Sequence, residues 1–370
     1  MQITKSEFLT AMKKAMPGVE SSNTILQGAD TYIFHNGYIY TYNDAISVSV
    51  HFPITNKAGE NISAAIKAKD FYDLVSRYEG DTITIIPKND MWIIKSENAR
   101  AEITLLENNL IERIQGIRID SKKFTKIPER FFEGMQLCNF SSKSQLSGLF
   151  CNEQVMVSAD ELKINWYGLN DAFVNSFWIN NDAVTELLKL SNPKKYYVSD
   201  SWVHFITEDK TVFSCKRLVQ DNYPFDKINT LVTTHAKEKG DIFNELPNKL
   251  IDAVNRAAAL STNIESFDTV KLTFNKDFIE VFSQRPSGKY TENVPWEKPF
   301  KKEFDPISIF VDYNMIESGI KYSKSFYLKN TVVISKIDSS NGKTESKTRT
   351  RVIFVSEFGI QLISTFDGGE

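Results

Sequence analysis

The sequence has few cysteines and no long hydrophobic run. Its 370 residues include only Cys138, Cys151 and Cys215, an odd number without a CxxC pair. This count argues against a disulfide framework and a cysteine zinc site, and it is typical of a reducing compartment. No segment approaches the roughly eighteen apolar residues of a membrane helix, and the first residues lack a signal-peptide core. We therefore expect a soluble, cytoplasmic protein.

The common enzyme signatures are also missing. The chain contains no GxGxxG, GxxxxGK[ST], GxSxG or HExxH motif. Four histidines are scattered through strand-like or loop segments, where sheet-face and surface positions are commoner than metal ligands: His35, His51, His204 and His235. The sequence therefore predicts a protein without catalytic activity, metal or cofactor.

The charge is nearly balanced, with 44 basic and 47 acidic residues and a net charge of -3. A balanced chain has no overall field that attracts nucleic acid. Any binding to nucleic acid must then come from basic residues that gather on one surface.

What the sequence does contain is a long internal repeat. Segments with helical periodicity begin near residues 5, 128 and 247, about 120 residues apart. An alternating hairpin pattern follows each one, at 31–52, 147–168 and 270–284. A second helical pattern follows each hairpin, at 68–78, 181–191 and 312–323, and further alternating segments close each unit. Asp44 and Asp160 are predicted to occupy equivalent places after the hairpin turn.

This order predicts three small α+β domains of one design, each with two helices packed on antiparallel sheets. We place them at 1–119, 120–241 and 242–370, with charged connectors at 107–123 and 233–245 and a polar hairpin loop at 339–351. The period is too long for a solenoid. A triplicated domain without a shared task is the alternative interpretation.

Three segments resemble the bacterial-type DNA sliding clamp, the β subunit of DNA polymerase III. "AVNRAAALS" followed by "FDTVKLTFNKDFIEVFSQRP" resembles the third domain of that family, and "CKRLVQDNYPFDKI" resembles its linker. "NGYIYTYND" resembles part of the first domain. The lysine-, asparagine- and phenylalanine-rich composition suggests an AT-rich genome, such as that of a virus of bacteria.

The resemblance implies a ring of two chains, with six domains, helices facing the hole and sheets outside. Such a ring encircles duplex DNA, binds DNA polymerase and a clamp loader through short hydrophobic peptides, and acts as a processivity factor. The alternative is a clamp-derived module that recruits partners without encircling DNA.

The implied inner surface consists of six helical segments, which carry 14 basic and 10 acidic residues although the whole chain is acidic. Mild positive charge suits sequence-independent phosphate contacts. The expected DNA-binding residues are Lys13, Lys14, Lys67, Lys143 and Lys189. The arginine that the family has after the first helix is absent from "VESSNTIL".

The family binds partner peptides in a cleft between its second and third domains. The matching residues are Leu146, Ala159, Lys163, Ile164, Pro224, Lys227, Ile228 and Phe267. Glu161 and Leu162 replace a glycine and a histidine of the family, which predicts a changed peptide preference. The C-terminal tail is longer than in the family, so its part in the cleft is left open.

The resemblance also places the seam between the two chains. Its residues are Ala259 and Leu260 on one side and Ala101 and Ile103 on the other. The family has bulkier groups at two of these places. Because buried apolar area contributes roughly 25 cal/mol per Å², we expect a weaker seam or one of different construction.

Overall fold

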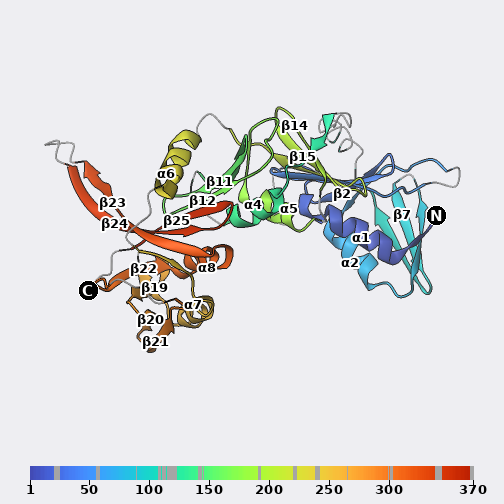
Figure 1. Cartoon of the computed structure of the whole chain (residues 1–370). Helices are drawn as coiled ribbons and strands as arrows, with labels where there is room; N and C mark the ends of the chain where they lie inside the picture. Colours follow the sequence, from blue (N-terminus) through green and yellow to red (C-terminus); the bar gives the residue numbers. More distant parts are fainter. Residues whose placement is uncertain are drawn as a thin grey trace. The chain divides into compact units, whose positions relative to one another are not determined.

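The computed structural model describes most of the chain, and its relation to the sequence is shown in Figure 1. The described residues are 1–20, 26–55, 59–88, 90–106, 110, 114, 123–140, 144, 146–190, 193–219, 223–237, 242–264, 266–298, 300, 303–337 and 344–366. No helix within these ranges combines the length and apolarity needed to cross a membrane.

One order of elements recurs three times: a strand, a helix, three strands, a fourth strand, a second helix and three closing strands; the third pass has one additional short strand directly after its first helix. The first pass comprises β1 (Gln2–Thr4), α1 (Lys5–Ala15), η1 (Met16–Gly18), β2 (Thr31–His35), β3 (Tyr38–Tyr42), β4 (Ile46–His51), β5 (Ala64–Lys67), α2 (Ala68–Arg77), β6 (Thr82–Pro87), β7 (Met91–Ser96) and β8 (Ala99–Thr104). The second comprises β9 (Thr125–Lys126), α4 (Phe131–Cys138), β10 (Leu149–Asn152), β11 (Val155–Ala159), β12 (Lys163–Gly168), β13 (Phe177–Ile179), α5 (Asn181–Leu188), β14 (Lys195–Val198), β15 (Trp202–Ile206) and β16 (Val212–Lys216).

The third pass follows an additional helix, α6 (Phe225–Lys237). It comprises β17 (Ile242–Glu245), α7 (Leu250–Ala258), β18 (Thr262–Ile264), β19 (Phe267–Phe274), β20 (Phe278–Arg285), β21 (Gly288–Pro295), β22 (Ile307–Asp312), α8 (Tyr313–Tyr322), β23 (Ser325–Ile337), β24 (Thr344–Val355) and β25 (Gly359–Ser364). The predicted α+β class, with two helices and antiparallel sheets in each repeat, is confirmed.

Two expectations for the segments between these elements are wrong. Residues 233–245 were predicted to be a charged connector, but they contain the end of α6 and the strand β17. Residues 339–351 were predicted to be a loop, but β24 begins at Thr344 and pairs with β23 from there. The connector at 107–123 lies almost entirely outside the described residues, as does part of "VESSNTIL".

The chain divides into two compact units. Residues 1–129 and 173–220 form the first, and residues 130–172 and 221–370 form the second. The second repeat is thus shared between the two units. The three domain boundaries drawn from the sequence stay predictions.

The first unit contains two sheets, ordered β1-β6-β7-β8 and β5-β2-β3-β4-β16-β15-β14-β9. Its core is aromatic: Phe8 of α1 and Phe71 of α2 lie against Phe34 of β2 and Trp92 of β7, and all four are almost fully buried. The Phe34 and Trp92 ring centroids are 4.9 Å apart. Each ring contributes roughly 1.5–3 kcal/mol through burial, so the two helices and two sheets are held together by this cluster.

The second unit has a sheet ordered β10-β11-β12-β25-β24-β23-β17 and another ordered β18-β19-β20-β21, with β22 on β19. Helices α7 and α8 pack together over the second of these sheets. Helix α4 packs on β11 and β12, whereas α6 packs on β12 and β25 (Figure 1). The core includes Val254 of α7, Val281 of β20 and Phe354 of β24.

Strands from different repeats pair with each other in both units. In the first unit β4 pairs antiparallel with β16, and Ile46 is opposite Cys215. In the second unit β12 pairs antiparallel with β25, and Lys163 is opposite Ile363. We call the three consecutive hairpin strands that follow the first helix of a repeat (β2–β4, β10–β12 and β19–β21) its hairpin group. In each junction the third strand of one repeat's hairpin group pairs with the last strand of the next repeat.

A turn with the same hydrogen bonds begins β4 and β12. The Asn43 amide donates to the Ile46 carbonyl, and its side-chain oxygen accepts from the amides of Ala45 and Ile46. Asp160 makes the same set of bonds with Leu162 and Lys163. The equivalent of Asp160 is therefore Asn43 and not Asp44, which is exposed. An Asx side chain at this place mimics a backbone turn, and either asparagine or aspartate supplies the acceptor.

We predict that Asn43→Ala and Asp160→Ala each lower the free energy of unfolding by about 1–2 kcal/mol, because each removes two hydrogen bonds from backbone amides to the side chain. Asn43→Ala also removes the hydrogen bond that its side chain donates to the Pro17 carbonyl. Asp44→Ala, in the same turn, is the control and should change it by less than about 0.5 kcal/mol. Urea unfolding of the three variants measures this. An equal loss for Asn43→Ala and Asp44→Ala would contradict the equivalence.

Candidate functional site

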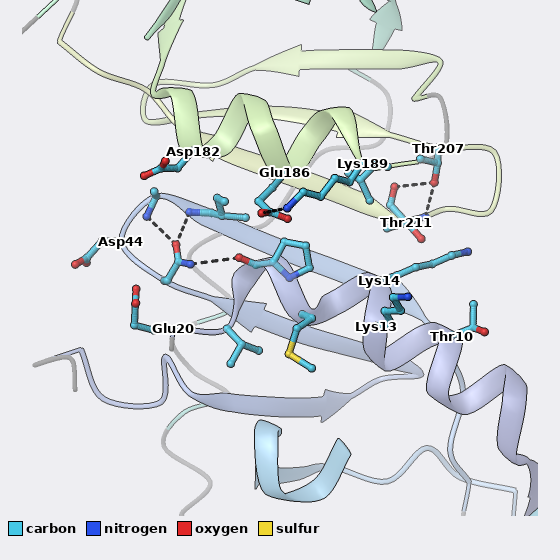
Figure 2. A pocket seen from close by; sticks show the side chains of 17 residues that line it. Thr10, Lys13, Lys14, Glu20, Asp44, Asp182, Glu186, Lys189, Thr207 and Thr211 are labelled. Atoms are coloured by element: carbon cyan, nitrogen blue, oxygen red, sulfur yellow. Dashed lines mark hydrogen bonds and ion pairs between the residues drawn. The ribbon is translucent and has the colours of Figure 1, made fainter. Parts of the chain in front are cut away.

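A hollow of about 890 Å³ in the first unit brings three predicted DNA-binding residues together. Figure 2 shows α5 on one side and α1 on the other, with the β3–β4 turn at one end and the β15–β16 turn at the other. Lys13 and Lys14 come from the last turn of α1, and Lys189 follows the last turn of α5. We call this space the α1–α5 hollow. It lies where the first and second repeats meet.

Lys14 is held by an acidic partner from the other repeat. Its ammonium pairs with Asp209 in the β15–β16 turn. Asp209 also accepts the Thr207 hydroxyl and, at 3.2 Å, the Thr211 amide. Partial burial raises the pKa of Asp209, but these hydrogen bonds and Lys14 outweigh burial and hold the pKa well below its usual range. The carboxylate is therefore a fixed anion that Lys14 faces at neutral pH.

The other lining charges divide the hollow into two ends. Lys189 pairs with Glu186, three residues earlier on α5. Glu20, Asp44 and Asp182 lie at the end away from Lys13 and Lys14 (Figure 2). Three lysines thus share the lining with four carboxylates, so cationic character is confined to the end beside the β15–β16 turn.

The remaining two predicted lysines do not line this hollow. Lys67 is exposed just before α2 and pairs with Asp30. Burial raises the pKa of Asp30, and the hydrogen bond and charge of Lys67 lower it, with a net decrease. Lys143 lies outside the described residues.

The predicted peptide-binding residues divide over two faces of one sheet in the second unit. Because side chains alternate along a strand, Ile164 and Trp166 share one face of β12, where the Trp166 indole donates to Asn229 of α6 at 2.9 Å. Ala159 and Leu362 are opposite Ile164 on the flanking strands. Pro224 and Ile228 belong to the start of α6, which packs on this same face.

Lys163 lies on the other face of β12, beneath α4. Asn165, two residues on, donates to the Leu137 carbonyl of that helix at 2.7 Å. The Lys163 side chain is almost fully buried, with its ammonium 5.3 Å from the Phe140 ring. Burial lowers the pKa of Lys163 to about 8, although Asp160 and Asp312 act in the opposite direction. Its position separates it from Ile164, and it is not a cation at the rim.

Three further predicted residues surround this region at different places. Lys227 is exposed in the first turn of α6, and Leu146 is half-buried before β10. Phe267 lies in β19, in the other sheet of the second unit, with its ring centroid 5.0 Å from that of Phe366. The structure therefore gathers Ala159, Ile164, Pro224 and Ile228 around α6.

The predicted seam residues lie on or beside two edge strands. Ala101 and Ile103 are half-buried on β8, the last strand of its sheet. Ala259 is exposed and Leu260 half-buried directly after α7. A methyl group placed on Gly288, in the edge strand β21, would lie 3.8 Å from Cδ1 of Leu260.

Sequence reasoning missed α6, Asp209 and Trp166. The α6 segment contains Ile228, Val232 and His235 on a buried face, at helical spacing. Its threonines and valine favour strands, which concealed the period. Asp209 had no sequence signal, because its partner is 195 residues away. Within the described residues, no group of three or more histidine, cysteine, aspartate or glutamate side chains could hold a metal.

Comparison with solved structures identifies the fold. The chain matches the DNA polymerase III β chain of Streptococcus pneumoniae with a TM-score of 0.75 and 16% identity, over 99% of both chains. It matches the Bacillus subtilis sliding clamp with a TM-score of 0.74 and 16% identity, over 100% of this chain and 99% of that one. The Helicobacter pylori β clamp bound to a DNA ligase peptide gives 0.73 and 15%, over 99% of both.

Sequence comparison alone does not detect this likeness, since no protein-family model and no curated protein matches the chain. Over its whole length the chain nevertheless has the fold of the bacterial DNA sliding clamps, as the resemblance in the sequence predicted.

Proposed function

We propose that two copies of this chain close into a ring around duplex DNA and act as a sliding clamp. The ring is a processivity factor without catalytic activity, which tethers a DNA polymerase and other replication proteins through short hydrophobic peptides. The observation that carries the proposal is the full-length match to sliding clamps. The pairing of strands between repeats supports it independently.

The two junctions within the chain follow one pairing rule, and two strands to which the rule would also apply remain at sheet edges. β4 pairs with the last strand of the second repeat, β16, and β12 pairs with the last strand of the third, β25. The third strand of the remaining hairpin group is β21, and the remaining last strand is β8. Both are edge strands of the described sheets. An exposed edge is a template for another chain, so β21 of one copy can pair with β8 of another, and two copies close with two such seams.

We extrapolate the register of this seam from the two internal junctions. Ile46 and Lys163 are the fourth residues of the turns that begin at Asn43 and Asp160. Gly288 is in the same way the fourth residue of the turn that begins at Arg285, with which it pairs. Their partner Cys215 comes four residues after Thr211, which ends the β15–β16 turn, and Ile363 comes four residues after Gly359, which ends the β24–β25 turn. Ile103 likewise comes four residues after Ala99, which ends the β7–β8 turn. Gly288 is thus expected opposite Ile103, and Lys289 opposite Glu102.

This register has favourable chemistry at both positions. Gly288 has no side chain, so the Ile103 side chain of the second copy can enter the space beside Leu260. Lys289 and Glu102 are both exposed and carry opposite charges, and opposite charges at directly facing positions stabilise antiparallel pairs. The small Ala101 and Ala259 add little apolar area.

A second candidate is a clamp-derived module that recruits partners without encircling DNA. The small seam residues favour it, and so do the four carboxylates that line the α1–α5 hollow. It keeps the peptide cleft and gives up the ring.

Retention on DNA distinguishes the two candidates. A closed ring cannot leave a circle, so protein bound to nicked circular plasmid should stay bound through gel filtration and be released when the plasmid is linearised. Equal loss from circular and linear plasmid would exclude encirclement and favour the recruiting module.

The seam register is tested by cysteine cross-linking. Facing residues of an antiparallel pair have Cα atoms about 4.5–5.5 Å apart, within the range for a disulfide. Lys289→Cys with Glu102→Cys should therefore give a disulfide-linked dimer under mild oxidation. Lys289→Cys with Thr104→Cys, shifted by two residues, is the matched control and should cross-link poorly. The three native cysteines are buried and do not interfere.

The outcome separates assembly from register. Native mass measurement should show a dimer for the wild-type chain and a monomer for Leu260→Asp, because a charge cannot be buried beside Ile103 at low cost. A wild-type monomer at micromolar concentration would refute the ring. A dimer that cross-links only through the control pair would refute the register alone.

The peptide cleft is tested on the face of β12 that α6 covers. Burying a leucine or phenylalanine anchor contributes roughly 1.5–3 kcal/mol, so ordering costs leave micromolar binding. Ile164→Asp should weaken binding of a polymerase tail peptide by about tenfold or more, while the chain stays dimeric. Leu260→Asp should bind the peptide normally. Unchanged affinity in a folded Ile164→Asp variant would place the cleft elsewhere.

A further inference from the structure

A second hollow, of about 430 Å³, lies in the second unit between α4, the end of α8 and the β24–β25 turn. We call it the α4–α8 hollow. Its basic lining residues are Arg130, directly before α4, and Lys321 and Lys324 at the end of α8. None of the three was singled out in the sequence.

The α4–α8 hollow lies at the junction between the second and third repeats, as the α1–α5 hollow lies at the junction between the first and second. Helix α4 is the first helix of its repeat, as α1 is, and α8 is the second helix of its repeat, as α5 is. The β24–β25 turn precedes the last strand, as the β15–β16 turn does. The α4–α8 hollow therefore lies beside the β12–β25 pair in the way that the α1–α5 hollow lies beside the β4–β16 pair.

The two hollows differ in charge. The α1–α5 hollow has three lysines against four carboxylates. The α4–α8 hollow has Arg130, Lys321 and Lys324 against two carboxylates, Glu133 and Glu357. One of these, Glu133, already accepts the Tyr167 hydroxyl at 2.6 Å. Among the described lining residues, cations therefore outnumber carboxylates in the α4–α8 hollow but not in the α1–α5 hollow.

Arg130 is also held in position before any ligand arrives. Its guanidinium carbon lies 3.6 Å from the centre of the Phe358 ring, in the β24–β25 turn. Stacking fixes the plane of the guanidinium, which also hydrogen-bonds with the Tyr167 side chain. A guanidinium has five N–H groups, and its planar fork matches the oxygens of a phosphate. Lys321 and Lys324 are exposed beside it.

We propose that the α4–α8 hollow binds a backbone phosphate of duplex DNA through Arg130, Lys321 and Lys324. The duplex itself rests on the proposed function. Arg130 supplies an oriented contact, and the two lysines supply charge without fixed geometry. Contacts of this kind to phosphate are independent of base sequence, as sliding requires. Lys321 also lies in the last turn of α8, where a cation stabilises the helix end, so a test must report on DNA and not on stability.

The test is the salt dependence of duplex binding. For each phosphate contact that is lost, the slope of log affinity against log salt concentration should become shallower by about 0.9. We expect Arg130→Gln to remove about one such contact, and Lys321→Gln with Lys324→Gln to remove one or two. Lys276→Gln is the matched control, because Lys276 is a half-buried lysine of the β19–β20 turn that already pairs with Glu303. It should leave the slope unchanged.

The results separate the site from the function. If the wild-type protein stays on circular plasmid and the hollow variants have the slope of Lys276→Gln, the α4–α8 hollow is not a phosphate site. If the wild-type protein is not retained on the circle, the ring fails, whatever the slopes are. Arg130→Lys should keep part of the DNA affinity that Arg130→Gln loses, because lysine keeps the charge but lacks the planar fork. If Arg130→Lys keeps none of this affinity and is also unfolded, Arg130 has a structural role only.

Discussion

Backbone hydrogen bonding between strands of different repeats is the constraint on which the architecture depends. A strand at the edge of a sheet carries unpaired amide and carbonyl groups, and covering them by another strand removes the risk of uncontrolled association. Here β16 covers β4 and β25 covers β12, so each sheet continues from one repeat into the next. The helices follow from this arrangement, because each pairing brings the first helix of one repeat near the second helix of the next.

The same constraint explains why both candidate DNA contacts lie at junctions. The α1–α5 and α4–α8 hollows each form where two repeats share a sheet, and neither is present in a single repeat. Their charges differ because different side chains line them: Lys14 faces the carboxylate of Asp209 in the first, whereas Arg130 faces the Phe358 ring in the second. The fold supplies the places, and individual side chains determine how strongly each place attracts phosphate.

Much of this fold is readable from the sequence. Helical periodicity located both helices of every repeat, because their buried faces are strongly apolar, as with Phe8 and Met12 of α1. It failed for α6, where threonines and valine obscured the period, and for the turn at Asn43, where an adjacent aspartate was the more obvious choice. Pairs that join distant residues, such as Lys14 with Asp209, leave no local pattern. The opposite orientation of Lys163 and Ile164 follows from strand alternation only once β12 is known to have α4 on one face and α6 on the other.

Under the proposed function, the lysines that already have carboxylate partners would have a consequence for motion along DNA. A Lys14 or Lys67 that moved to a phosphate would leave Asp209 or Asp30, and it would return to that carboxylate on releasing the phosphate. Each contact would then be an exchange between two anions, in which the energy gained on contact is largely matched by the energy given up. In a ring of the proposed kind, the energy profile along the duplex is then nearly flat, and movement meets little friction even though the inner surface touches many phosphates.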